Sequence, residues 1–288
     1  MKHSAFALAF AALLATACNT EKGPKDPGNS KWISRIVEYK PAPGQFINSY
    51  LGNAEAAQRI VGGKNGCVSL GGYGGYVIFE FDHDVRNIGG TDFVVFGNAF
   101  EGSSEPGIVE VSPDGESWYR LKGSEDQTAS TIHNYTITYT KPGQTSTAEA
   151  IAWTDNQNGS GQTETVSAHL QCYWPLFLSG DPATLTFTGT LLPGNSAWNG
   201  EKFVLAAFAW GYTDNWSAGY NETAGDDPDT KGSNKFDLDN AVDRNGNPVT
   251  LTAIRQVKVY TAMNQNVGGG IGETSTEVCG ALSLSADL

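Results

Sequence analysis

The chain has 288 residues and a formal net charge of −13, from 31 acidic and 18 basic side chains. This balance argues against nucleic acid as a partner, because phosphate binding requires clustered lysine and arginine. An acidic surface remains compatible with divalent cations and with neutral ligands.

The first seventeen residues, 1–17, have the pattern of a signal peptide. Lys2 precedes an apolar run from Ala5 to Ala15, which is too short to span a bilayer as a helix, since that needs about 20 residues. Small residues then precede Cys18, in a pattern that resembles the lipobox of bacterial lipoproteins, although Ala15 stands where leucine is usual. We therefore expect Cys18 to be acylated and to anchor the protein to a membrane. The alternative is an ordinary signal peptide followed by a cysteine.

The mature chain predicts an all-β fold in one domain. Residues 18–30 have no large apolar side chain after Cys18 and are expected to form a flexible tether. Residues 31–288 carry short strand patterns separated by turn residues, with a hairpin around Pro113-Asp114-Gly115. This arrangement favours a β-sandwich or jelly roll. Strands are expected at 76–81, 92–96, 108–112, 118–121, 135–139, 185–191, 203–210 and 254–260, and one short helix at 54–61.

Acylation of Cys18 leaves three cysteines, Cys67, Cys172 and Cys279. An odd number permits at most one disulfide and leaves a free, buried thiol. The sequence does not determine which two would pair. The simpler interpretation is that the cysteines pack as small buried hydrophobes.

Two groups of oxygen-bearing side chains predict a calcium site. A buried strand ends at Asn98, and the polar loop after it carries Glu105, while Asp214 and Asp237 belong to a second acidic group. Calcium takes about 6–8 oxygen ligands, and like charges held together need a cation or hydrogen-bond donors. The alternative is that these side chains bond to the backbone or face solvent.

Aromatic residues in glycine-rich, polar segments predict a ligand surface. Rings on loops grip flat ligands and sugar rings by stacking; the alternative is that they cap the ends of the sandwich. The chain has no G-x-S-x-G, H-E-x-x-H or P-loop motif, but a carboxylate pair for glycoside hydrolysis leaves no trace in sequence spacing. A hydrolase therefore stays as an alternative to a binding protein. The candidate ligand-binding rings are Tyr73, Tyr76, Trp174, Trp198, Tyr212 and Trp216.

Several segments together resemble a family of lipoproteins of gut-type Gram-negative bacteria that are usually labelled only cell surface protein. They are 38–48, 92–118, 153–156, 210–215 and 236–248, and the likeness extends over nearly all of residues 33–280. Members look like galactose-binding-type jelly rolls, and some are encoded beside TonB-dependent transporters, including those for vitamin B12.

The resemblance implies a protein at the outer face of the outer membrane. There it would capture a nutrient, either a corrinoid or a glycan, and pass it to a TonB-dependent transporter. A structural or adhesive module that binds another protein is a third hypothesis.

Overall fold

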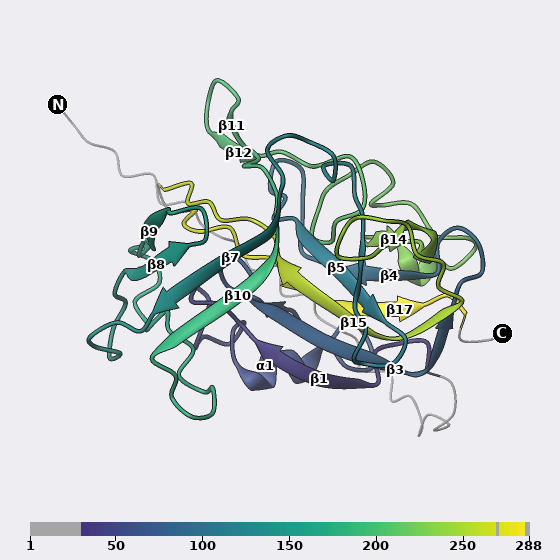
Figure 1. Cartoon of the computed structure of the whole chain (residues 1–288), viewed down its shortest axis with the longest axis horizontal. Coiled ribbons are helices and arrows are strands. Elements are labelled where there is room, and N and C mark those ends of the chain that lie inside the picture. The colour runs from purple at the N-terminus through teal and green to yellow at the C-terminus, as the bar shows by residue number, and fades with distance from the viewer. Residues whose placement is uncertain (1–29, 269–270, 286–288) are drawn as a thin grey trace.

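The computed structural model describes residues 30–268 and 271–285 (Figure 1). The predicted signal peptide, the acylated Cys18 and the tether up to residue 29 lie outside the described residues. Within the part that is described, no helix is long and apolar enough to cross a bilayer.

One layer of the fold is a six-stranded antiparallel sheet in the order β1-β3-β15-β5-β6-β14. Along β3, Val77, Phe79 and Phe81 are fully buried, and the residues between them are partly exposed. This alternation gives the sheet one apolar face, which packs inward. Its strands are β1 (Arg35–Lys40), β3 (Tyr76–Arg86), β15 (Ala253–Thr261), β5 (Gly107–Ser112), β6 (Tyr119–Leu121) and β14 (Ala241–Val242).

The facing layer is a three-stranded sheet, β13 (Asn234–Phe236)-β4 (Phe93–Phe96)-β17 (Gly280–Ser283), with the strand pair β16 (Glu277–Val278)-β2 (Val68–Ser69) beside it. Phe93 and Val95 of β4 share a core cluster with the inward side chains of the six-stranded sheet and with helix α1 (Ala54–Arg59). Val94 and Phe96 pack on the other side, against Trp32. Strand β4 is therefore buried on both faces, as its apolar sequence predicts.

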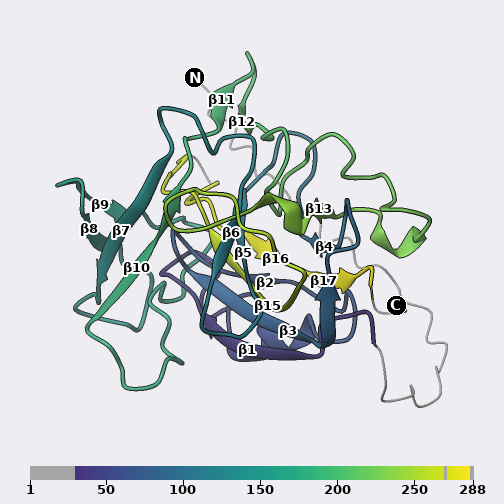
Figure 2. The same ribbon diagram turned by 45° about the vertical axis from the view of Figure 1, so that its right-hand side comes forward.

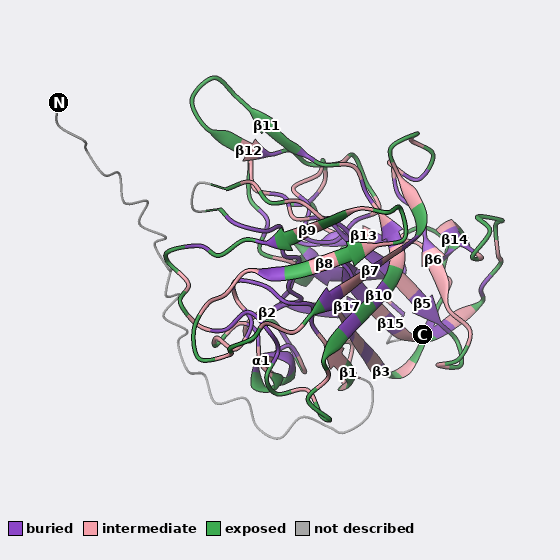
Figure 3. Ribbon diagram, turned by 60° about the vertical axis from the view of Figure 1, so that its left-hand side comes forward, coloured by how far each residue is buried: buried purple, intermediate pink, exposed green. Residues whose placement is uncertain are grey.

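A four-stranded antiparallel sheet, in the order β10-β7-β8-β9, packs over a second core of aromatic residues. Its strands are β7 (Ile132–Thr140), β8 (Ile151–Asp155), β9 (Ser160–Thr163) and β10 (Thr184–Leu191). The hairpin β11 (Ser196–Trp198)-β12 (Phe203–Leu205) projects from the body of the domain (Figures 1 and 2). Figure 3 shows how much of this hairpin is exposed. Two short 3₁₀ turns are η1 (Pro228–Thr230) and η2 (Leu238–Asn240).

The all-β sandwich is confirmed, with most of the expected strands and the short helix near their predicted places. The hairpin through Asp114 is present, because β5 and β6 pair antiparallel. The strand expected at 203–210 stops at Leu205, and this part of the prediction is wrong. Beyond that point the backbone bonds to side chains and loops instead, for example Phe208 N to Asn215 Oδ1 at 2.9 Å.

One disulfide joins Cys67 to Cys279, and Cys172 is free and buried. The structure therefore reaches the upper limit of one disulfide that the cysteine count permits. The expected free, buried thiol is Cys172, whereas the interpretation of the cysteines as small buried hydrophobes is wrong for Cys67 and Cys279. The pairing could not be predicted from the sequence because it joins residues 212 positions apart. Cys67 directly precedes β2, and Cys279 directly precedes β17.

Candidate functional site

The six rings predicted to bind a ligand do not form one exposed surface. Tyr73, Trp174 and Tyr212 are buried, so the prediction that they lie exposed on loops is wrong. The glycines around Tyr73 allow other segments to approach closely: a Cβ at Gly74 would lie 2.3 Å from Cβ of Phe187. Glycine-rich sequence here marks tight packing and not an open loop.

The other three candidate rings have different environments. Tyr76 is partly buried beneath Nζ of Lys258, which lies 5.0 Å from the ring centroid. Trp216 is partly buried, with its centroid 5.1 Å from that of Tyr220. Only Trp198 is strongly exposed, at 60%, and it lies on the projecting hairpin.

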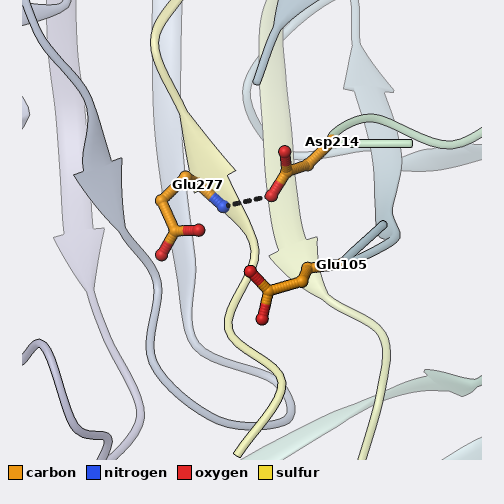
Figure 4. A group of neighbouring side chains, drawn as sticks. All are labelled: Glu105, Asp214 and Glu277. Carbon is orange, nitrogen blue, oxygen red and sulfur yellow. Dashed lines mark hydrogen bonds between the residues drawn. The ribbon is translucent and has the colours of Figure 1, made fainter. Parts of the chain in front are cut away.

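Two of the predicted metal ligands, Glu105 and Asp214, do meet, and Glu277 joins them (Figure 4). One carboxylate oxygen from each lies within 4.8 Å of the others. The chain builds this contact from three segments: Glu105 N donates to Asp214 O at 2.9 Å, and Glu277 N donates to Asp214 Oδ2 at 2.9 Å. We call these three side chains the carboxylate cluster.

Backbone geometry holds the carboxylate cluster in place. Asp214 has a φ of 53°, a left-handed conformation that aspartate tolerates better than most residues. A Cβ at Gly97 would lie 2.6 Å from Cα of Asp214, so only glycine fits there. Asn98 N then donates to Asp214 Oδ1 at 2.9 Å, and Ser275 N donates to Glu105 Oε1 at 3.0 Å.

No basic side chain compensates the cluster, since none of the ion pairs among the described residues involves these carboxylates. Burial and the charge of Asp214 raise the pKa of Glu105 to about 8. Burial raises the pKa of Asp214 to about 7, against the opposing effect of the backbone N–H groups that bond to it. Burial and the charges of Glu105 and Asp214 raise the pKa of Glu277 well above its usual range. The three groups must therefore share protons or a cation.

Two further buried oxygens lie close to the cluster in the chain. Glu273 accepts from Gln45 N through Oε1 at 2.6 Å, while its Oε2 has no partner within the described structure. Burial raises the pKa of Glu273 to about 8. The buried hydroxyl of Thr213, next to Asp214, likewise lacks a partner. A buried oxygen without a hydrogen-bond partner destabilises the fold. Glu273 and Thr213 each carry one such oxygen in the described structure.

The remaining predicted metal ligands behave differently. The side chain of Asn98 is exposed, and only its backbone N–H reaches the cluster. Asp237 is outside the cluster, because its carboxylate caps the turn η2 by accepting from Asp239 N at 2.8 Å. Glu277 was missed since its neighbours are small or apolar and give no acidic pattern.

A polar groove of about 860 Å³ lies where the four-stranded sheet meets the outer part of the six-stranded sheet. Its walls come from β7 and β10 on one side, and from β5, β6 and the turn after β14 on the other. Among the described residues, Trp118 is the one aromatic side chain other than His133 that lines it. The lining residues are Glu110, Trp118, Arg120, Asp126–Thr128, Thr131, His133, Asn134, Thr188–Thr190 and Asp243–Gly246.

Charges at the base of the groove are already paired. Glu110 accepts from Lys258 Nζ at 2.9 Å, and Arg120 pairs with Asp126. Burial, reinforced by Arg120, lowers the pKa of His133, so that its imidazole is neutral at neutral pH. The groove could not be predicted from sequence, because its lining residues come from three separate stretches of the chain, 110–134, 188–190 and 243–246, and form no motif.

Two comparisons with known proteins found no match. No protein-family model matches the chain. No curated protein is significantly similar to it in sequence.

Proposed function

We propose that this protein is a non-catalytic, extracellular binding module that captures a nutrient ligand in the polar groove. The observation that carries the proposal is the groove itself. Its volume of about 860 Å³ falls within the range of about 300–1,000 Å³ that small-molecule sites have. It also combines one indole ring with several hydrogen-bonding side chains, the combination that orients a ligand.

In this proposal Cys18 carries a lipid that anchors the domain to the outer membrane, facing the cell exterior. The ligand is a corrinoid or a glycan, and a TonB-dependent transporter receives it. These points follow from the predicted signal peptide and from the family resemblance. Substituting Cys18→Ser should move the protein from the membrane fraction to the soluble fraction, and unchanged membrane association would contradict lipid anchoring.

Binding is favoured over hydrolysis by the state of the acidic residues. A glycosidase needs two carboxylates that reach the substrate. In the cluster, Asp214 and Glu277 are buried, and in the groove Glu110 and Asp126 are bound to basic partners. A hydrolase remains the alternative, as does an adhesive module that binds another protein.

We further propose that the carboxylate cluster holds a structural calcium ion. Its donors are all oxygens, which hard cations prefer, and Glu105, Asp214 and Glu277 lack basic partners in the described structure. Of the ligands predicted from sequence, this proposal keeps Glu105 and Asp214 and omits Asp237.

Calorimetry of the mature domain against cyanocobalamin and a glycan panel tests the binding function. We expect saturable heat with at least one of the two classes and no turnover of chromogenic glycosides. Heat with neither class would contradict nutrient capture. Turnover that Glu105→Gln abolishes would establish the hydrolase instead.

A further inference from the structure

The walls of the groove continue into a row of hydroxyl groups on the exposed face of the four-stranded sheet. Thr188, which lines the groove, has its Oγ1 2.8 Å from Oγ1 of Thr136 on the neighbouring strand. Two residues further along each strand, Thr186 and Thr138 form the same contact at 2.9 Å. Residues two apart in a strand share a face. The groove therefore opens onto an extended polar path that follows β7 and β10.

The groove also requires no charge from its ligand. Glu110, Arg120 and Asp126 are each neutralised by an ion pair. His133 is held by Thr190 Oγ1 at 3.1 Å and by the carbonyl of Asp126 at 3.2 Å. Bringing a charged ligand against such a base would cost desolvation without a free opposite charge to offset it. Two charged lining residues form no ion pair within the described part of the chain: Arg244, which is exposed, and Asp243, which is partly exposed and accepts hydrogen bonds from Asn247.

Within the described residues that line the groove, one indole ring is available for stacking. Trp118 is partly exposed and lines the groove. A sugar ring presents one apolar face of C–H groups and a rim of hydroxyls, so it can stack on one indole while its rim bonds to amides and hydroxyls. A corrinoid is much broader, and its macrocycle needs a wide apolar surface. The groove lining, which is mostly polar, does not provide one.

We infer that the groove binds a neutral oligosaccharide, with one sugar ring stacked on Trp118 and the chain extending along the threonine row of β7 and β10. This inference rests on the proposed binding function and narrows it to one ligand class at one place. The residues of this proposed site form no recognisable motif in the sequence.

The test is calorimetry on the mature domain with cellohexaose, xylohexaose, mannohexaose, an oligogalacturonate of the same length, and cyanocobalamin. We expect at least one neutral hexasaccharide to bind, with an affinity that does not change between low and high salt, because no charge pair forms. Trp118→Ala should weaken this binding by about tenfold or more, the usual loss when a central aromatic contact is removed.

Matched variants separate the groove from other surfaces. Trp198→Ala removes an exposed indole on the projecting hairpin and should leave the affinity unchanged. Arg244→Gln removes the exposed guanidinium that lines the groove and tests whether it pairs with an anionic ligand. Circular dichroism and the melting temperature show whether Trp118→Ala is folded. If that variant is unfolded, Thr188→Ala, which removes one hydroxyl of the row, replaces it and should weaken binding.

The outcomes distinguish failure of this inference from failure of the proposed binding function. Loss of binding in Trp198→Ala with retention in Trp118→Ala would overturn the placement in the groove. Oligogalacturonate binding that Arg244→Gln abolishes would overturn the neutral class, and binding of cyanocobalamin alone would overturn the saccharide; both leave the proposed binding function intact. No heat with any probe would overturn the inference and the proposed function together.

Discussion

Removing one charge from the carboxylate cluster should change how the stability of the protein depends on pH. The perturbation is Glu277→Gln, measured in the presence of a chelator. Glutamine keeps an Oε1 that accepts from Ser275 Oγ, as Glu277 Oε1 does at 3.3 Å. The substitution therefore preserves shape and hydrogen bonding while it removes a titrating group.

The sign of the effect follows from the raised pKa values. In the unfolded chain these carboxyl groups have pKa values near 4, whereas burial raises the pKa of Asp214 to about 7 and that of Glu105 to about 8. Between about pH 5 and 8 the folded state thus holds more protons than the unfolded state. The stabilisation that protonation provides is complete at low pH and is lost as the pH rises through the folded pKa values.

Each extra proton in the folded state contributes a slope of about 1.4 kcal/mol per pH unit. For a domain of this size that corresponds to roughly 3–6 °C in melting temperature per pH unit. We expect the wild type to lose stability from pH 5 to 8, and Glu277→Gln to have a slope that is shallower by about one proton.

The matched control is Glu201→Gln, on the exposed hairpin, whose slope should equal that of the wild type. Burial lowers the pKa of His133 and of His169, which acts in the opposite direction, but this contribution is common to all three proteins and cancels in the difference. Equal slopes for Glu277→Gln and the wild type would refute the reasoning.

Calcium in 100-fold excess over its dissociation constant should stabilise the wild type by about 2.7 kcal/mol, and an unchanged melting temperature at pH 8 would contradict the calcium proposal.

Three other predictions concern stability. Reducing the bond between Cys67 and Cys279 should cost about 2–5 kcal/mol, because it closes a loop of 212 positions; denaturant unfolding with and without reductant measures this, and coincident curves would be evidence against it. Thr213→Val, which removes a buried hydroxyl without a partner, should raise the melting temperature by a few degrees in chelator, since an unpaired buried polar group costs about 1–3 kcal/mol. Gly97→Ala should lower the free energy of unfolding by about 1–3 kcal/mol or more, because its Cβ would lie 2.5 Å from Asp214 Oδ1. A melting temperature within a degree of the wild type would show instead that Asp214 can move to make room for the methyl group.

Local patterns in the sequence were sufficient for the main strands. The alternation at 76–81 and the apolar run at 92–96 each reflect burial that a strand imposes on its own residues. Strand β1 was missed, since its residues Arg35–Lys40 are partly or fully exposed and carry no apolar alternation. Strand β8 was missed because only one of its five residues is buried, and β9 was missed because polar and glycine residues dominate it.

The carboxylate cluster could be predicted only in part. Glu105 follows a buried strand, which is a local signal, and Asp214 lies in a conspicuous acidic group. Asp237 looked equivalent but caps its own turn, because backbone N–H groups compete for a carboxylate that is close in the chain. Glu277 and Trp118 gave no signal at all. The partners of Glu277 in the cluster, Glu105 and Asp214, come from distant segments of the chain, and single-sequence spacing contains no information on such contacts.

The central claim is that Trp118 and the polar groove form the ligand site. The most direct measurement is a crystal structure of the mature domain bound to the neutral hexasaccharide that binds most tightly. The account predicts electron density for a sugar ring on the indole of Trp118, continuing over the threonine row of β7 and β10. Density on the hairpin at Trp198, with an empty groove, would contradict it.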